Sequence, residues 1–333
     1  MSDLLTPDDT RDALRKLGGL LLGLGVLMWT LRKGEDMSDF VLFVVFAAPA
    51  ALLYGLGVFT ERDTGGLRSW QTVYSVFGLI FVPLALFTFI QLIDGTPGAA
   101  LNIFWVFGVT AALAFYAGVV AGIRFQLLAG SIAVIVAWSA LWHKILSDGI
   151  SENYGVYRGL LGIIAIALLV AAVYVWRTDP GPDGRPGTPT DVAGDRGLWK
   201  ASELFTGAGI AAVTACSLGF LNLALGQIPL IEVDLPGTNF LWDVALLIIS
   251  LGLVTVGALI GLRGPVYVGA IGLLLFLLIV GQDLNEDQPD PTNFGIWPIV
   301  LLVLGALGVA LSSVKEASQG DKPTQLVDKL RGR

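Results

Sequence analysis

The sequence has 333 residues, of which 55% are hydrophobic and only 14% are charged, and its mean hydropathy is +0.76. Soluble domains carry about 25% charged residues, so this composition excludes a disordered chain and argues against a soluble globular domain. The net charge is −7 and no basic stripe occurs, which leaves nucleic-acid binding without electrostatic support. We therefore expect a polytopic membrane protein whose partners are membrane lipids, with other membrane proteins as further candidates.

Ten apolar segments follow one another along the chain, each bounded by charges, prolines or polar clusters. They cover residues 17–31, 40–60, 70–93, 100–122, 124–143, 157–176, 199–224, 239–262, 264–281 and 294–312. About 20 helical residues cross the hydrocarbon core of a bilayer. A backbone in lipid must satisfy its own hydrogen bonds, and these segments do not alternate as barrel strands do. The sequence predicts an all-α integral membrane protein with about ten transmembrane helices.

The first segment, 17–31, is short, and whether it fully spans the membrane is left open by the sequence. A stretch rich in Pro, Gly and Asp after the sixth segment predicts a linker without packed structure. The expected divisions are an N-terminal segment (1–16), two N-terminal transmembrane helices (17–60), four helices (68–177), the linker (178–198), four further helices (199–312) and a polar tail (313–333).

Lysine and arginine are distributed unequally between the two predicted sides of the membrane. With the N-terminus in the cytoplasm, inner segments hold 16 of the 20 cationic residues, and the outer loops hold Arg32, Lys33, Lys144 and Arg158. This bias predicts a protein of the cell membrane with both termini and the linker on the cytoplasmic side. The nine tryptophans lie near predicted helix ends, where indole rings prefer the headgroup boundary.

Two parts of the chain resemble one another. Residues 118–132 (GVVAGIRFQLLAGSI) match 257–271 (GALIGLRGPVYVGAI) at an offset of 139, and NYGVY at 153–157 matches NFGIW at 293–297 at an offset of 140. The repeating unit would hold four helices, the third to sixth and then the seventh to tenth. Since four is even, both copies share one orientation, which predicts a parallel tandem repeat about an axis along the membrane normal.

The recurring residues are two arginines, two asparagines and four glycines. They are Arg124 and Arg263, Asn153 and Asn293, and Gly118, Gly122, Gly257 and Gly261. The structural interpretation assigns the glycines to close helix packing, the asparagines to N-caps and the arginines to turns. The alternative is a pair of related sites in which the arginines and asparagines contact an anionic lipid headgroup or solute.

Residues that usually carry chemistry are scarce. The chain has one cysteine, Cys216, and one histidine, His143, which leaves no thiolate metal cluster and no HExxH motif. The apolar segments hold almost no ionisable residue. The nearest exceptions are Glu203, expected to pair with Lys200, and Asp243, expected to reach outer water.

These absences lead us to expect no catalytic residue, no metal and no cofactor, and therefore a protein that is not an enzyme. The leading hypothesis is a non-enzymatic scaffold or accessory membrane subunit. The alternative is a permease or channel for an uncharged or lipid-like solute, with mid-membrane polar residues such as Ser75, Thr110 and Asn222 lining its path.

Overall fold

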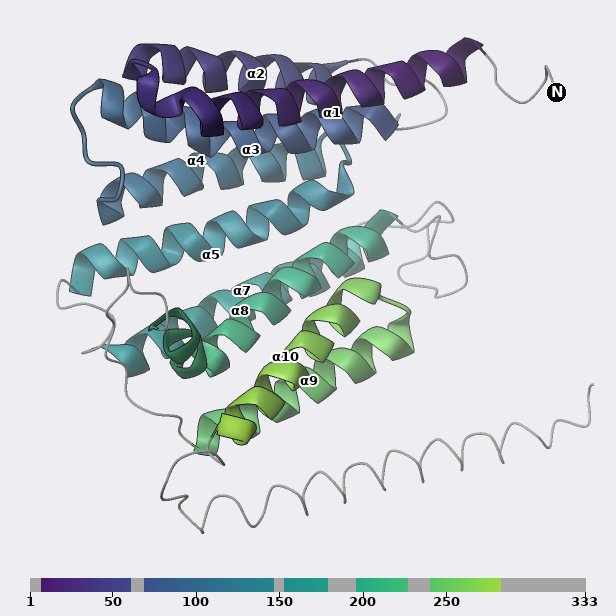
Figure 1. Cartoon of the computed structure of the whole chain (residues 1–333). Coiled ribbons are helices and arrows are strands. Elements are labelled where there is room, and N and C mark those ends of the chain that lie inside the picture. The colour runs from purple at the N-terminus through teal and green to yellow at the C-terminus, as the bar shows by residue number, and fades with distance from the viewer. Residues whose placement is uncertain (1–6, 61–68, 147–152, 179–195, 227–239, 283–333) are drawn as a thin grey trace, which may run out of the picture. The chain divides into compact units, whose positions relative to one another are not determined.

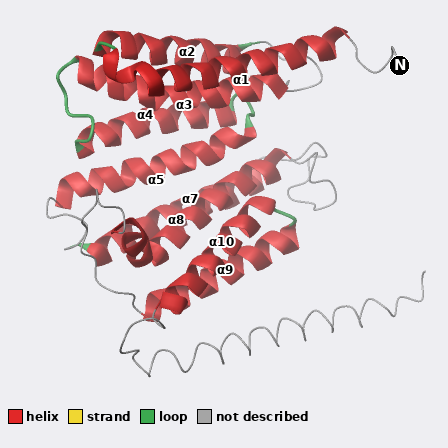
Figure 2. Cartoon of the chain, viewed as in Figure 1, coloured by secondary structure: helices red, strands yellow, loops and turns green. Residues whose placement is uncertain are grey.

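The described part of the computed structural model is helical throughout and contains no strand (Figure 2). It comprises residues 7–60, 69–146, 153–178, 196–226 and 240–282. This confirms the all-α prediction. The tenth predicted helix, 294–312, the tail and most of the linker lie outside the described residues.

The described helices follow the predicted apolar segments closely (Figure 1). Their bounds are α1 Pro7–Lys33, the 3-10 turn η1 Gly34–Asp36, α2 Asp39–Phe59, α3 Ser69–Leu92, α4 Ala100–Val119, α5 Arg124–Leu146, α7 Tyr154–Thr178, α8 Arg196–Gly226, α9 Phe240–Ile260 and α10 Arg263–Gln282. Within the described segments, the eight helices from α1 to α9 are long and apolar enough to cross a membrane, while α10 contributes a shorter apolar helix, Arg263–Ile279. The chain is therefore membrane-embedded.

Helix α1 is longer than the apolar segment that predicted it, because it begins at Pro7 instead of residue 17. Proline suits the first helical position, where its missing N–H has no intrahelical partner to lose. The added turns are polar, and within them Arg15 and Asp12 form an ion pair of 3.9 Å. With 27 residues, α1 extends about 40 Å, so its length exceeds the hydrocarbon thickness.

The contacts divide the chain into two units, Met1–Leu274 and Leu275–Arg333, and all packing described below lies in the first unit. In it, α2 packs on α3, α4 on α5, α7 on α8, and α5 on α8. The α5–α7–α8 contact is an apolar core that includes Leu161, Leu168 and Ala211.

Helix α1 packs mainly on α3 and less on α2. The contact uses two glycines of α1: a Cβ at Gly19 would overlap the ring of Tyr74, and one at Gly23 would overlap the ring of Phe77. The opposite faces of α1 are apolar and exposed, with Leu31 at 88% exposure. Such a helix is held by a narrow strip of small residues, as is common for helix pairs in membranes.

One end of the helices in this unit collects basic and tryptophan residues. The Arg15 guanidinium lies 5.2 Å from the ring centroid of Trp70, and the Arg124 guanidinium lies 5.2 Å from that of Trp199. The first turns of α3 and α5 are joined here by Gln126 Nε2, which donates to the Ser75 carbonyl at 2.9 Å. We call this the Arg124 end of the helices.

Candidate functional site

The α4–α5 and α9–α10 connections use the glycines that recur in the sequence. Gly122 has φ 63° and Gly261 has φ 80°, a left-handed conformation that costs other residues about 1–2 kcal/mol. Gly118 lies against α5, since a Cβ there would come within 2.5 Å of the Leu127 side chain. A Cβ at Gly257 would lie 2.7 Å from Val266 of α10. In both hairpins, one glycine makes the turn and the other permits the close approach.

The two recurring arginines begin the second helix of each hairpin, Arg124 in α5 and Arg263 in α10, and both are exposed. Besides its contact with the Trp199 ring, Arg124 interacts electrostatically with Glu203 of α8. Lys200 shares the same ring, with Nζ 5.8 Å from its centroid. An exposed cation over an indole ring contributes about 0.5–1 kcal/mol, so Arg124 links α5 to α8.

Arg263 lies at the edge of a helix contact. Next to it, the missing side chain of Gly264 leaves the room that Thr206 of α8 occupies, so the first turn of α10 touches α8. The Thr206 hydroxyl donates to the Ser202 carbonyl of its own helix at 2.7 Å. The Arg263 side chain itself is exposed beside this contact.

The asparagine of the first copy lies far from these arginines. Asn153 immediately precedes α7, and its carbonyl accepts the N–H groups of Val156 and Tyr157 at 2.9 and 3.1 Å. The first turns of α7 contact the last turns of α5, where His143 Nδ1 and the Tyr157 hydroxyl are 3.2 Å apart. Since α5 has 23 residues, Arg124 at its start is separated from Asn153 by about 34 Å of helix. The two residues do not share one site, and Asn293 lies outside the described residues.

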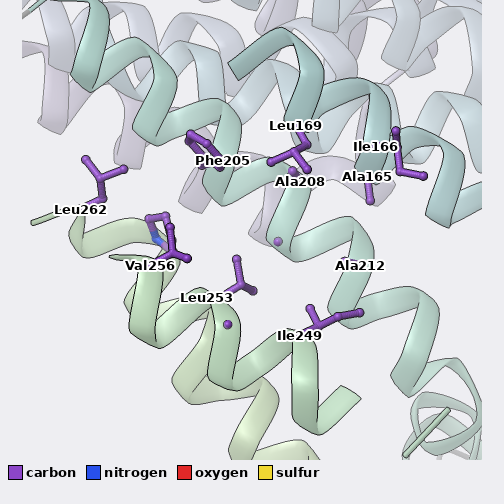
Figure 3. A pocket seen from close by; sticks show the side chains of 13 residues that line it. Ala165, Ile166, Leu169, Phe205, Ala208, Ala212, Ile249, Leu253, Val256 and Leu262 are labelled. Carbon is purple, nitrogen blue, oxygen red and sulfur yellow. The ribbon is translucent and has the colours of Figure 1, made fainter. Parts of the chain in front are cut away.

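An apolar groove of about 410 Å³ lies between α7, α8, α9 and the beginning of α10 (Figure 3). Small residues of α8 and α9 create the space, because Ala208, Ala212 and Gly252 leave room between the larger side chains. Apart from the backbone of its own helix and its chain neighbours, no described atom lies within 4 Å of where a Cβ at Gly252 would be. The sequence did not predict this groove, and its only local signal is the four-residue spacing of the two alanines.

The groove wall is apolar throughout, and three of its side chains are also open to the surroundings. Ile166 is 62% exposed, Val256 45% and Leu169 42%. Figure 3 shows Leu262 and Phe205 toward one end of the groove and Ile249 with Ala212 toward the other. The groove can therefore hold hydrocarbon but offers no group for polar recognition within it.

A buried arginine cluster joins the first turns of α7 and α9, at the end of the helices opposite Arg124. Arg158 is only 4% exposed. It donates a hydrogen bond to the Tyr154 hydroxyl, and its guanidinium lies 4.1 Å from the Tyr154 ring centroid and 4.8 Å from that of Trp242. Asp243, which interacts electrostatically with Arg158, is 6% exposed.

This cluster corrects one expectation. Asp243 was expected to reach outer water, but its side chain is buried, and so is that of Arg158, which was counted with the cations of the outer loops. Enclosure by two aromatic rings and a nearby opposite charge compensates for the cost of removing a guanidinium from water. The Nε of Arg158 has no hydrogen-bond partner among the residues that the structure describes. The local signal in the sequence was the i,i+4 spacing of Tyr154 and Arg158.

Four buried serine and threonine hydroxyls bond to the backbones of their own helices, whereas the buried Ser250 hydroxyl has no partner among the described residues. Ser75 donates to the Thr72 carbonyl at 2.9 Å and Thr110 to that of Val106 at 2.8 Å. Ser131 and Ser217 donate in the same way, to the carbonyls four residues earlier, at 2.9 and 2.8 Å. Asn222 lies in a part of α8 whose side chains the structure does not describe. Ser75 and Thr110, two of the candidates for a polar path, thus form hydrogen bonds within their own helices.

The scarce reactive residues are held in structural contacts. The Ser139 hydroxyl donates to the Ile135 carbonyl at 2.9 Å, and His143 contacts the Tyr157 hydroxyl. Cys216 is 4% exposed. In the described ranges no three His, Cys, Asp or Glu side chains gather as a potential metal site. Comparison of the chain with protein-family models, curated proteins and solved structures gave no match.

Proposed function

We propose that this chain is a non-enzymatic scaffold or accessory subunit of the cell membrane, built from about ten helices. The observation that carries the proposal is the use of the buried hydroxyls of Ser75, Thr110, Ser131 and Ser217 within their own helices. A path for a polar solute needs such groups to face an opening, whereas these four hydroxyls donate hydrogen bonds to backbone carbonyls of their own helices.

The junction between the two proposed four-helix copies supports the same function. There α5 and α7 pack on α8 through an apolar core, and Gly207 of α8 lies directly against Ser131 of α5. A transporter with tandem copies commonly keeps its substrate site at the interface between them. The apolar packing of α5 and α7 on α8 favours a structural role, and the groove that opens between α7, α8 and α9 at the same junction is apolar as well.

We infer that the two copies are related by a parallel tandem repeat. The inference is supported by the left-handed glycines at Gly122 and Gly261, each of which precedes a helix that begins with an arginine. In each hairpin the glycine four residues earlier lies against the second helix. The cationic residues at the Arg124 end further support a cytoplasmic location for that end and for both termini.

The scaffold role is tested by flux through the purified chain in liposomes. We expect the uptake of uncharged solutes such as glycerol and urea to equal that of protein-free vesicles, for the natural chain and for Ser131→Ala alike. We also expect extracts in mild detergent to contain the chain in one complex of defined size, larger than the purified chain alone. Saturable uptake that the Ser131 substitution changes would refute the scaffold role.

The apolar groove favours a second function, passage of a lipid-like solute. The test follows a fluorescent phospholipid between the leaflets of vesicles that contain the chain, with a membrane-impermeant quencher. A permease would accelerate this movement, and Gly252→Leu, which fills the groove, would slow it. A scaffold predicts the rate of protein-free vesicles for both forms.

A further inference from the structure

The groove has the length of one bilayer leaflet. It is lined at one end by Leu262 and Pro265, where α9 turns into α10, and it continues along α9 to Ile249 (Figure 3). From Ile249 to the end of α9 at Ile260, the helix extends about 16 Å at ~1.5 Å per residue. Half of a hydrocarbon core of about 30 Å is about 15 Å, so the groove runs from a helix end to the middle of the bilayer.

The chemistry of the groove selects a hydrocarbon chain. Its wall is apolar, its volume of about 410 Å³ falls within the ~300–1,000 Å³ usual for ligand pockets, and exposed side chains such as Ile166 border its mouth. Around a membrane-embedded chain, the molecules that can enter such a mouth from the side are lipids. An extended acyl chain is also the part of a lipid that reaches from the headgroup to the bilayer centre.

The end of the groove at the α9–α10 turn carries positive charge. Arg263, between the groove residues Leu262 and Pro265, is exposed at the first position of α10, and no described carboxylate pairs with it. The N-terminus of a helix adds free N–H groups and the positive end of its dipole. Arg124 and Lys200 stand at the same end of the helices, over Trp199.

We propose that the groove holds one acyl chain of an anionic phospholipid, and that Arg263 binds the phosphate of its headgroup. The lipid fills the space between α7, α8 and α9 and attaches the α9–α10 hairpin to the helices before it. This inference goes beyond the scaffold role, because it assigns a bound lipid whether or not the chain also holds a protein partner.

The test uses the full chain in nanodiscs with phosphatidylglycerol that carries a diazirine in the middle of its acyl chain. After illumination, mass spectrometry locates the adducts. We expect them to concentrate on groove residues of α8 and α9. Gly252→Leu projects a side chain into open groove space and should reduce these adducts to the level of other lipid-facing helices. Gly108→Leu in α4 is the matched control, since its Cβ position is also empty and lies outside the groove.

The headgroup is tested by competition between the photoreactive phosphatidylglycerol and unlabelled phosphatidylcholine. A cation near an anionic headgroup contributes about 1 kcal/mol, so Arg263→Gln should lower the preference for the anionic lipid about fivefold while adducts remain in the groove. Equal labelling of the Gly252 and Gly108 variants would overturn the groove assignment. Adducts without a headgroup preference in the natural chain would overturn the role of Arg263. A dimer that Gly252→Leu dissociates would assign the groove to a second copy instead.

Discussion

Replacement of Gly78 by alanine should loosen the contact between α2 and α3. Gly78 of α3 lies against the backbone of Tyr54 in α2, and a Cβ there would overlap the Tyr54 nitrogen and lie only 2.7 Å from its Cα. Carbon atoms pack at about 3.5–4.0 Å, so the two helices must separate by about 1 Å. Backbone atoms cannot rotate away as a side chain does, and overpacking of this kind costs about 1–3 kcal/mol.

The displacement also affects a third helix. The Tyr54 hydroxyl donates to the Leu113 carbonyl of α4 at 2.7 Å, and this hydrogen bond must stretch if α2 moves outward. Its loss adds about 0.5–1.5 kcal/mol, which gives an expected total of about 1.5–4.5 kcal/mol for Gly78→Ala. Tyr54→Phe removes the hydrogen bond alone and should show only the smaller contribution.

The assay is unfolding in detergent, followed by circular dichroism during titration with a denaturing detergent. Gly55→Ala is the matched control, because it lies in α2 beside Tyr54 and its Cβ would meet nothing within 4 Å. Alanine favours helix over glycine by about 0.8–1 kcal/mol, so this control should be neutral or slightly stabilising. If Gly78→Ala unfolds at the same point as Gly55→Ala, the close contact of α2 and α3 is refuted.

Three further outcomes are expected. Gly261→Ala should destabilise the α9–α10 hairpin by about 1–2 kcal/mol, measured by the same titration, because alanine is strained at φ 80°. Trp242→Leu should cost about 2 kcal/mol by removing a ring from the buried guanidinium, whereas an unchanged midpoint would show that the ring contact contributes nothing. Single cysteines at Thr188 and Asp287, placed in a Cys216→Ser background, should react with an impermeant thiol reagent from opposite sides of the membrane, and same-side labelling would reject the predicted topology.

The sequence predicted the membrane helices well, because length and hydropathy alone decide whether a segment can span a bilayer. Eight described helices meet that criterion, and their ends fall near the charges that bounded the predicted segments. The start of α1 was placed too late, since residues 7–16 are polar and carry no hydropathy signal. The backbone hydrogen bonds of α1 extend beyond its apolar part into these polar residues, and hydropathy does not report on such bonds.

The contacts among helices were predicted less well. Spacing singled out Gly118 and Gly122, but Gly122 lies in a turn with positive φ. Gly78 approaches the backbone of α2 more closely than Gly118 approaches that of α5, yet no spacing motif in the sequence marks Gly78. A glycine pair indicates that a close helix contact is possible. Which helix makes the contact, and at what distance, depends on how helices that are far apart in the sequence pack together.

The burial of Arg158 could not be predicted from the sequence either, because one of the two rings that enclose it belongs to α9, more than eighty residues later in the chain. The groove has the same origin, since it is formed where small residues of α8 face α9. Both features arise from pairing between helices that hydropathy treats as independent. The candidate site therefore follows from tertiary packing, while the spans follow from composition.

The position of α1 has a consequence for biosynthesis. Its glycine strip faces Tyr74 and Phe77 of α3, which leave the ribosome only after α2 has been made. During that interval the first helix must reside in the lipid by its own hydropathy, with its docking strip open to insertion-machinery subunits or to other nascent segments. The arrival of α3 then closes the strip, so a nascent chain that stops after α2 should expose a binding surface that the finished protein conceals.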